Sequence, residues 1–419
     1  EGKAPGPLDD GDNIQVISSA CEDCPISTYT VTDNCQNCIG KACINACKFQ
    51  AIRPGRYRSH IDASRCKECG KCAQACPYNA IAHLKRPCKF ACPVNAITYD
   101  ERGISVIDRS KCINCGKCIH SCPFGAIGSK TYIVDVINAL KAGKRVYVMA
   151  APATEGQFGE DITMGSWKNA MLELGFEDFY DVSLGADMTA AYEAEEWSEA
   201  YKDGKKKVTS CCPAFVNMIR KHYPELADSI STTISPMCAI SRLIKARDPE
   251  AVTVFIGPCM AKKSEITDQK IEGNADYVLT YSEIRAIMRA KGVALQPAVG
   301  EKQIGSVYGK RFANSGGVTA AVLQSLKESK DEIDAKVCIA NGAAECKKAL
   351  VLLKAARLPE DFIEGMICDG GCVGGPSSFR DQISSKKNRE AVLAKADGRG
   401  IHENLQEYDM ESFSMHRHD

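Results

Sequence analysis

The clustering of cysteine is the feature that most limits what this chain can fold into. Sixteen of its 24 cysteines lie at or before Cys122, and most are separated from the next by two or three residues. Such spacing is too tight for a usual disulfide framework and favours metal ligation, because buried structural thiols account for only one or two of these residues. The predicted metal ligands of this region are Cys21, Cys24, Cys35, Cys38, Cys43, Cys47, Cys66, Cys69, Cys72, Cys76, Cys88, Cys92, Cys112, Cys115, Cys118 and Cys122.

Two of the cysteine runs repeat the same motif. Each run follows C-x2-C-x2-C-x3-C-P, once from Cys66 to Pro77 and once from Cys112 to Pro123. This is the pattern of bacterial ferredoxins, in which three thiolates of one run bind a 4Fe-4S cluster and the fourth reaches the other cluster. The pattern predicts two clusters, with ligands Cys66, Cys69, Cys72 and Cys122 for one, and Cys112, Cys115, Cys118 and Cys76 for the other.

The remaining eight thiols of this region are enough for two further clusters, about four in all. Cys35, Cys38 and Cys43 form a weaker copy of the motif, which either Cys47 or Cys92 could complete as the fourth ligand. Cys88 and Cys92 belong to a further fragment. For the pair Cys21 and Cys24, a zinc half-site and a redox pair are the alternatives to cluster ligation.

Charge and hydropathy exclude several classes of partner. Lys plus Arg and Asp plus Glu each number 53, so the balance gives no reason to expect a nucleic-acid partner. No apolar run approaches the ~18 residues that a membrane span requires. The first residues have no apolar core of a signal peptide, and we therefore expect a cytoplasmic protein.

Near residue 130 the sequence changes from cysteine-rich segments to alternating candidate strands and helices. Residues 1–130 are expected to form a ferredoxin-like α+β iron-sulfur domain that relays electrons, and residues 131–419 a two-lobed α/β domain. Strands are predicted at residues 144–149, 207–210, 252–256 and 336–339, and a helix from Pro213 to about Tyr223. The site of an α/β domain lies at the carboxyl ends of its strands, so loops that follow these strands are the candidates.

Three such loops carry cysteines in a recognisable order. They read Thr209-Ser-Cys-Cys-Pro-Ala-Phe215, Gly257-Pro-Cys-Met-Ala-Lys-Lys-Ser-Glu265, and Glu364 through Pro376, which contains Cys368 and Cys372. Together they resemble the three signature segments of the iron-iron (FeFe) hydrogenases. The resemblance covers residues 131 to about 385, and it implies a reversible reduction of protons to molecular hydrogen.

The resemblance implies a specific cofactor, the H-cluster, in which a 4Fe-4S cube is joined to a di-iron subsite with carbonyl, cyanide and dithiolate ligands. Its implied cysteine ligands are Cys212, Cys259, Cys368 and Cys372, with Cys372 as the bridge. Lys262 matches the lysine that contacts a cyanide, a role that a charged donor suits. Pro152 matches the segment that holds the other cyanide, and Met366 a methionine near the di-iron unit.

The resemblance also implies a proton path. Its members are Cys211 beside the cofactor, then Glu193, Ser231 and Glu196. Without the resemblance, glutamates three residues apart on a helix would be interpreted as part of a solvated face. Glu265 corresponds to an acidic residue for which a structural role is expected.

Several positions depart from the better-known family members and indicate a divergent lineage such as group B. Gly257 replaces Met, Met237 replaces Gln, and Ala200 stands where an arginine ends the usual proton path. Cys238, Cys338 and Cys346 match no ligand position and are predicted to be buried structural thiols.

The expected partners are an electron carrier such as ferredoxin and maturation proteins for the di-iron subsite. Two other functions compete with catalysis. An iron-sulfur assembly protein would keep the cube ligands without the di-iron unit, and a hydrogen sensor would turn over slowly beside a signalling partner.

Overall fold

A computed structural model describes residues 13–417, except residues 23, 25–27, 299–302 and 332. The N-terminal residues 1–12, on which the signal-peptide expectation rests, lie outside the described part. The chain divides into two compact units. The larger unit contains the described residues up to Gln15, Ser110–Gly116 and everything from Ser129 onward, and the smaller unit contains Val16–Arg109 and Lys117–Gly128. We describe each unit by itself.

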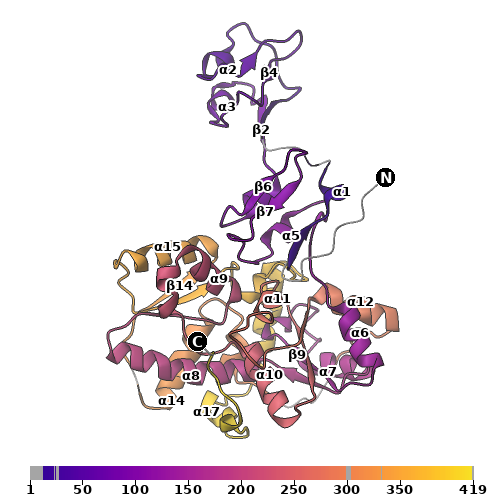
Figure 1. Cartoon of the computed structure of the whole chain (residues 1–419), viewed down its shortest axis with the longest axis vertical. Helices are drawn as coiled ribbons and strands as arrows, with labels where there is room; N and C mark the ends of the chain where they lie inside the picture. Colours follow the sequence, from indigo (N-terminus) through magenta and orange to yellow (C-terminus); the bar gives the residue numbers. More distant parts are fainter. Residues whose placement is uncertain (1–12, 23, 25–27, 299–302, 332, 418–419) are drawn as a thin grey trace. The chain divides into compact units, whose positions relative to one another are not determined.

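The smaller unit contains two modules of the same architecture, one inserted in the other (Figure 1). Residues 28–84 form the inserted module, and residues 16–24, 85–109 and 117–128 form the split module. In the inserted module, β2 (Thr28–Val31) pairs antiparallel with β5 (Ile81–Leu84), and β3 (Ile52–Arg53) pairs with β4 (His60–Ile61). Its short helices are α2 (Ala42–Asn45) and α3 (Lys71–Ala75).

The split module repeats this order of elements around the insertion. β1 (Ile14–Val16) pairs with β8 (Ile127–Ser129), and β6 (Ile97–Tyr99) pairs antiparallel with β7 (Ser105–Ile107). The helices are α1 (Ser18–Cys21), α4 (Pro87–Ala91) and α5 (Lys117–Ser121). The insertion lies between Cys24 and Cys88, so it divides the first cysteine motif of the split module.

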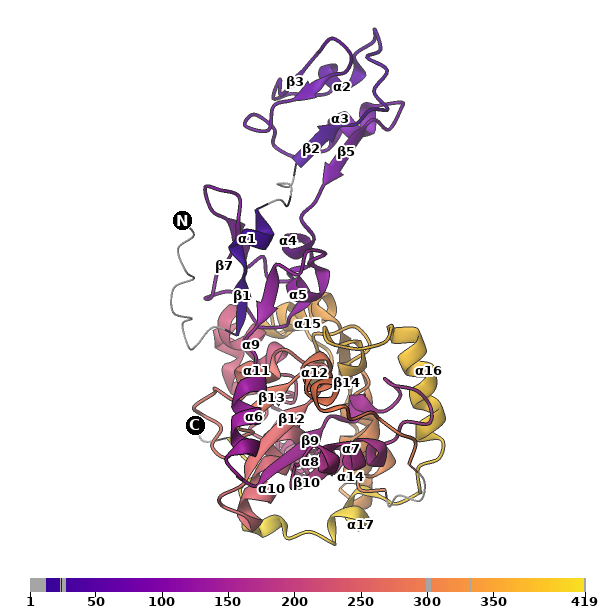
Figure 2. The ribbon, with the colours of Figure 1, turned by 90° about the vertical axis from the view of Figure 1, so that its right-hand side faces the viewer.

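The larger unit is built on two parallel sheets (Figure 2). The first has the order β10 (Asp178–Asp181), β9 (Val146–Ala150), β12 (Val252–Ile256) and β13 (Tyr277–Leu279). The second has the order β11 (Lys207–Val208), β15 (Phe362–Met366) and β14 (Val337–Asn341). The two sheets confirm the two-lobed α/β fold, although β11 is shorter than the predicted strand. Near-continuous runs of Val, Ile and Phe are typical of strands buried on both faces.

Helices cover both sheets and form the core with them. α8 (Ser183–Lys202) packs against α10 (Pro236–Arg247) and α14 (Gly317–Glu328). Alanine and glycine on α8 permit a close approach, because a Cβ at Gly185 would lie 2.3 Å from the Pro236 carbonyl. The other helices are α6 (Ile133–Lys141), α7 (Met164–Glu173), α9 (Pro213–His222), α11 (Lys262–Glu265), α12 (Tyr281–Lys291), α13 (Val307–Arg311), α15 (Ala343–Lys354), α16 (Gln382–Leu393) and α17 (Ile401–Leu405). Within the described residues, none of the helices combines the length and the apolarity needed to span a membrane.

Candidate active site

Loops from both sheets of the larger unit deliver four cysteines to one place. Cys212 follows β11 and is the N-cap residue of α9, and Cys259 follows β12. Cys368 and Cys372 follow β15, and Cys372 begins a 3-10 turn. All three strand ends are carboxyl ends, as expected for the site of parallel sheets.

The four thiols lie close enough to act on one another electrostatically. Burial, and after it the repulsion from Cys212, raises the pKa of Cys259 to about 11. Burial and then repulsion from Cys259 and Cys212 raise the pKa of Cys372 to about 12. The pKa of Cys368 is also raised, by burial first and then by Cys259 and Cys212. Four buried thiolates are unfavourable together without positive charge among them, so the set is suited to a metal cofactor.

The surroundings of the four cysteines fit an anionic cofactor. Each of the four cysteines is half-buried. Backbone amides near Cys212, including those of Ile367 and Phe215, act on its sulfur, and α9 presents its N-terminus there. These donors fit an anionic iron-sulfur cube.

Lys262 brings a buried positive charge to this site. Its side chain is 10% exposed, and its Nζ lies 2.8 Å from Ser235 Oγ and 2.5 Å from Glu265 Oε2. The ammonium lowers the pKa of Cys212, Cys259 and Cys372 against the larger effect of burial. Glu265 is therefore the ion-pair partner that holds Lys262 in place.

Cys211 and Glu193 lie side by side beneath this group. Cys211 is 9% exposed and Glu193 is fully buried on α8. Burial raises the pKa of Cys211, and the charge of Glu193 adds to the effect. Burial, and after it the charges of Glu196 and Glu364, raises the pKa of Glu193 to about 8. Glu193 is therefore mostly protonated at neutral pH.

Glu196 lies one turn further along α8 and has the opposite character. Ser231 Oγ donates to its Oε2 at 2.6 Å, whereas both carboxyl oxygens of Glu193 are buried without a hydrogen-bond partner among the described residues. Burial alone would raise the pKa of Glu196, but hydrogen bonds from Lys207, Ser231 and the Thr232 amide lower it. The structure thus brings the four predicted proton-path residues together and gives the two glutamates opposite protonation preferences.

A solvent-facing cavity of about 600 Å³ lies at the Glu196 end of this chain. Ala200, Lys207 and His416 line it, and Lys207 Nζ lies 2.8 Å from Glu196 Oε1. His416 Nδ1 lies 3.0 Å from Thr232 Oγ1. Sequence reasoning did not identify Lys207 or His416, because they lie outside the cysteine motifs. The only indication in the sequence was Ala200. It stands where the family has an arginine, and no other residue had been identified to supply that positive charge.

Pro152 and Met366, for which the resemblance implies contacts with the cofactor, are both buried. Met366 is 2% exposed at the end of β15, and Pro152 begins a buried 3-10 turn after β9. Arg389, 1% exposed, donates to the carbonyl of Pro152 and to that of Lys310. A methionine at Gly257, as in better-known members, would meet Phe255, since even a Cβ there lies 2.8 Å from its ring.

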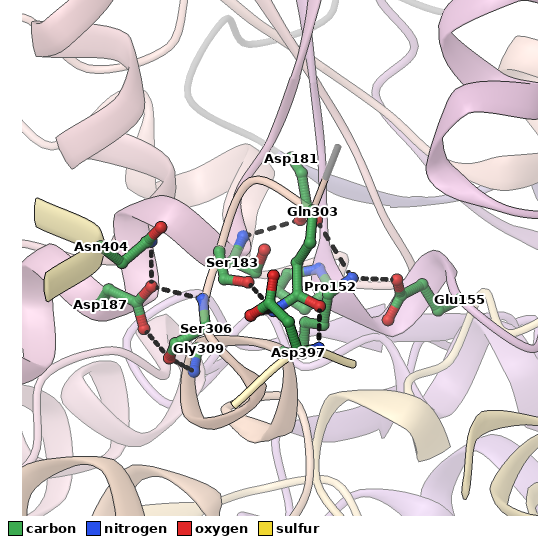
Figure 3. A network of polar contacts seen from close by, with 12 residues as sticks. Pro152, Glu155, Asp181, Ser183, Asp187, Gln303, Ser306, Gly309, Asp397 and Asn404 are labelled. Atoms are coloured by element: carbon green, nitrogen blue, oxygen red, sulfur yellow. Dashed lines mark hydrogen bonds and ion pairs between the residues drawn. The ribbon is translucent and has the colours of Figure 1, made fainter. Parts of the chain in front are cut away.

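Behind Pro152 the buried carboxyls form a polar network (Figure 3). Lys310 Nζ lies 2.5 Å from Glu155 Oε1 and 3.7 Å from Asp181 Oδ2. Asp187 accepts hydrogen bonds from the amide and hydroxyl of Ser306 and from Asn404 Nδ2, at 2.6–2.8 Å. Burial raises the pKa of Asp187 to about 7 despite these donors. Arg389 links this network to the cysteines, because it lies 3.9 Å from Glu155 and its charge lowers the pKa of Cys372 against the larger effect of burial.

The inserted module overturns the predicted pairing of the ferredoxin-type thiols. One small cavity is lined by Cys35, Cys38, Cys43 and Cys76, and a second by Cys47, Cys66, Cys69 and Cys72. Cys76 therefore completes the set of Cys35, for which Cys47 and Cys92 were the predicted candidates. Cys122, predicted to join Cys66, instead lies with Cys21, Cys24 and Cys88 in the split module. Cys47, Cys76 and Cys122 thus each lie with cysteines of their own module.

Four matching turns explain why the fourth cysteines are equivalent. After each of them the residue three positions on has a positive φ, namely Gln50, Asn79, Asn95 and Gly125. The next amide, always of an alanine, then donates to the cysteine Sγ at 3.2–3.4 Å. Amide donors of this kind stabilise thiolate ligands. The repeat is fourfold, whereas the sequence motifs indicated two strong copies.

The three cysteines without a ligand role differ from one another. Cys238 is completely buried in α10, and Cys346 is completely buried and donates to the Ala340 carbonyl at 3.4 Å. Cys338 is half-buried on β14, so its predicted burial is wrong. Neighbouring residues of β14 are also partly exposed, as on a strand at the edge of its sheet.

Comparison with known proteins is consistent with this geometry. Residues 144–376 match the family described as "Iron only hydrogenase large subunit, C-terminal domain", and residues 59–82 match a "4Fe-4S binding domain". Residues 82–133 match an "LdpA Fe-S cluster-binding domain".

Curated relatives include hydrogenases and one assembly factor. Iron hydrogenase 1 of Clostridium pasteurianum is 30% identical over 403 residues, covering 80% of this chain and 68% of the relative. The large subunit of the periplasmic Fe hydrogenase of Nitratidesulfovibrio vulgaris is 29% identical, covering 59% of this chain and 72% of the relative. The cytosolic Fe-S cluster assembly factor NAR1 of Kluyveromyces lactis is 34% identical over 79 residues, covering 19% of this chain and 17% of the relative.

Solved structures show the same fold. A variant of the FeFe hydrogenase HydA1 of Chlamydomonas reinhardtii matches with a TM-score of 0.55 at 22% identity, covering 66% of this chain and 93% of that one. A HydA structure described as a stage of stepwise H-cluster assembly matches with a TM-score of 0.53 at 21% identity, covering 66% of this chain and 92% of that one.

Proposed function

The chain belongs to the iron-only hydrogenase family, and from this we propose that it catalyses the reversible reduction of protons to molecular hydrogen. One observation carries the proposal. Cys212, Cys259, Cys368 and Cys372 converge beside the buried Lys262, and the buried thiol of Cys211 lies next to them. Assembly proteins that bind only a cube have no need of a buried proton path.

The four converging cysteines would hold the H-cluster, with Cys372 as the bridge to its di-iron subsite. When bound, this cofactor supplies the iron chemistry that combines electrons with protons. The chain's own residues orient and charge-balance it. Lys262 would donate to an anionic ligand of the cofactor, and Glu265 fixes the direction of that ammonium. Pro152, held by Arg389, and Met366 would shape the walls.

The buried acids would carry protons between solvent and the Cys211 Sγ atom. Glu193 favours its protonated form and Glu196 its ionised form, and Ser231, which donates to Glu196, lies near Glu193. Neighbouring acids with pKa values moved in opposite directions are a common arrangement for proton transfer. Glu196 would exchange protons with water in the cavity that Lys207 and His416 line.

Electrons would reach the cofactor through the ferredoxin-type cysteines. In the inserted module, one cluster would be bound by Cys35, Cys38, Cys43 and Cys76, and a second by Cys47, Cys66, Cys69 and Cys72. In the split module, a third would be bound by Cys21, Cys24, Cys88 and Cys122. Within the larger unit, Cys115 lies close enough to Cys368 for its charge to raise the pKa of that thiol. Asn217 and Lys221 of α9 hold this loop through the carbonyls of Ile113 and Cys112.

The proposed electron donor is an acidic carrier such as a ferredoxin. Arg53, Arg56 and Arg58 are exposed on the hairpin between β3 and β4 of the inserted module. Asn37 Nδ2 donates to the carbonyls of Gly55 and Arg56 at 3.1 and 3.2 Å, which ties this hairpin to the Cys35–Cys38 loop. Positive charge beside a cluster site favours the docking of an acidic partner. Maturation proteins would supply the di-iron subsite.

The proposal is tested by hydrogen evolution from chemically reduced viologen. Protein matured with the di-iron subsite should evolve hydrogen, and protein that carries only its ordinary clusters should not. Matured protein with proven di-iron content but negligible turnover would favour the hydrogen sensor. Protein that never accepts the di-iron unit would favour the assembly role, which the NAR1 similarity raises.

A further inference from the structure

Arg86 lies at the point where the chain returns from the inserted module to the split module. Cys24 is the last cysteine before the insertion, and Cys88 is the first after it. Arg86 is the N-cap residue of α4, with Pro87 as the first helical residue and Cys88 as the second. The insertion therefore places an arginine inside a divided cluster motif.

The Arg86 side chain is 2% exposed and extends into the thiols. One guanidinium nitrogen donates to the carbonyl of Cys24, and the other lies 3.4 Å from Ser105 Oγ and 4.0 Å from Cys21 Sγ. Ser105 connects the group, because its amide donates to Cys21 Sγ at 3.4 Å and its hydroxyl lies 3.6 Å from Cys88 Sγ. A buried positive charge is thus in direct reach of this ligand set.

The residues of this site fit an iron-sulfur cluster. Amides of Ser105 and Ala126 donate to the sulfurs of Cys21 and Cys122, and the apolar residue Ile104 covers them. The potential of such a cluster depends on the net charge around it, on hydrogen bonds to its sulfurs and on its exposure to solvent. We propose that Arg86 is a built-in cation that raises the reduction potential of the cluster bound by Cys21, Cys24, Cys88 and Cys122.

The inserted module provides an internal comparison. Lys41 lies two residues before Cys43, as Arg86 lies two residues before Cys88. Lys41 is half-buried, and its Nζ is held by the side chain and the carbonyl of Asn37. A less buried charge acts less strongly, because water screens it. The cluster beside Arg86 should therefore have a higher reduction potential than the cluster beside Lys41.

The test is a redox titration monitored by electron paramagnetic resonance. The full chain is made without the maturation proteins, so only ordinary clusters are present, and the inference is tested whether or not the chain turns over hydrogen. In Arg86→Gln, one reduction step should move to lower potential by a tenfold or larger change in its equilibrium constant, which is about 59 mV for one electron. Arg86→Lys, which keeps the charge, should hold that step near its wild-type position.

Arg102→Gln is the matched control in the same module. The Arg102 side chain is 69% exposed and pairs with Glu22 at 3.9 Å and Asp100 at 3.6 Å. Its replacement should therefore leave every reduction potential unchanged. Unmoved steps in Arg86→Gln at full iron content would overturn the proposal, as would an equal shift in Arg102→Gln. If Arg86→Gln loses a cluster, Arg86→Lys decides. An Arg86→Lys protein with full iron content and an unchanged reduction potential supports the proposal. One with full iron content and a lowered reduction potential contradicts it.

Discussion

Lys207 Nζ lies 2.8 Å from Glu196 Oε1, so the cation at the outer end of the buried acids comes from β11. The better-known family members place an arginine on the helix, where this chain has Ala200. The ion pair is largely shielded, with side-chain exposures of 16% for Lys207 and 12% for Glu196. It is therefore less screened than a surface pair. We propose that Lys207 takes the place of that arginine.

Lys207→Gln should slow hydrogen evolution and change its pH dependence. Lys207 helps to lower the pKa of Glu196, so its loss lets that pKa rise, and protonation of Glu196 begins at higher pH. The acidic limb of the pH-rate profile should then move to higher pH, and Lys207→Arg should restore it. Lys202→Gln is the control, since the exposed Lys202 pairs with Asp331 at 3.1 Å and does not line the cavity. Identical profiles for Lys207→Gln and wild type would remove Lys207 from the path.

The Cys211→Ala variant should contain the assembled cofactor but evolve hydrogen very slowly, whereas the Cys212→Ala variant should contain no assembled cofactor. The alanine at position 211 has no exchangeable proton between the cofactor and Glu193. A proton-transfer group contributes ~100- to 10,000-fold in rate. Hydrogen evolution per intact cofactor is the measurement, and Cys211→Asp should recover more of it than Cys211→Ala. A wild-type rate in Cys211→Ala would show that protons bypass this thiol.

Substitutions of the adjacent residues Lys262 and Lys263 should distinguish an effect on cofactor binding from an effect on folding. Lys262→Ala should lower the retention of the di-iron unit, because hydrogen bonds to charged groups contribute about 1.5–3 kcal/mol. Lys263 pairs with Glu283 at 2.8 Å and donates to the Lys130 carbonyl at 2.6 Å, so Lys263→Ala should reduce stability but leave occupancy per folded protein unchanged. Infrared band intensity per folded chain reports occupancy. Equal losses in both variants would contradict a specific role for Lys262.

Asp187→Asn should reduce the pH dependence of stability. Burial raises the pKa of Asp187 in the folded protein from the ordinary 3.8 to about 7. The folded chain therefore holds a proton that the unfolded chain releases between these values, and this contribution is present at acid pH and lost as pH rises toward 7. The difference in thermal midpoint, Asp187→Asn minus wild type, should increase from pH 4 to pH 7. A constant difference would show that Asp187 is ionised in the fold.

Charge reversal on the β3–β4 hairpin should affect only a protein donor. The double variant Arg56→Glu with Arg58→Glu should slow cluster reduction by an acidic ferredoxin, most strongly at low salt, because steering by opposite charge is lost. Reduction by a small viologen should be unchanged. Lys386→Glu with Lys387→Glu on α16 is the control for total charge. Equal rates with ferredoxin would place docking elsewhere.

Local spacing predicted four of the seven strands in the two sheets of the larger unit, missing β10, β13 and β15, and it identified the ferredoxin-type motifs. β12 was predicted at its observed bounds, because a short run of Val, Ile and Phe between turn residues has few alternatives. The pairing of Cys76 and Cys122 was wrong because it depends on which strands close each module. β2 and β5 close the inserted module around Cys76, and spacing along the chain carries no information on such nesting.

The candidate site shows the same division between local and long-range information. Cys212 and Pro213 are adjacent, so the helix start that holds the ligand was predictable from sequence. Lys207 is eleven residues from Glu196 and on another element, and a lysine at a strand start is usually on the surface. Arg86 and Ser105 approach Cys21 from more than sixty residues away, which no local motif indicates.

Infrared spectroscopy of anaerobically matured protein tests the central claim most directly. If Cys212, Cys259, Cys368 and Cys372 hold an H-cluster, the wild type should show carbonyl and cyanide stretching bands. Cys372→Ser, which removes the proposed bridge, should lose them while the ferredoxin-type clusters remain. Absence of these bands from the wild type, when the same maturation proteins load a known hydrogenase in parallel, would contradict the account.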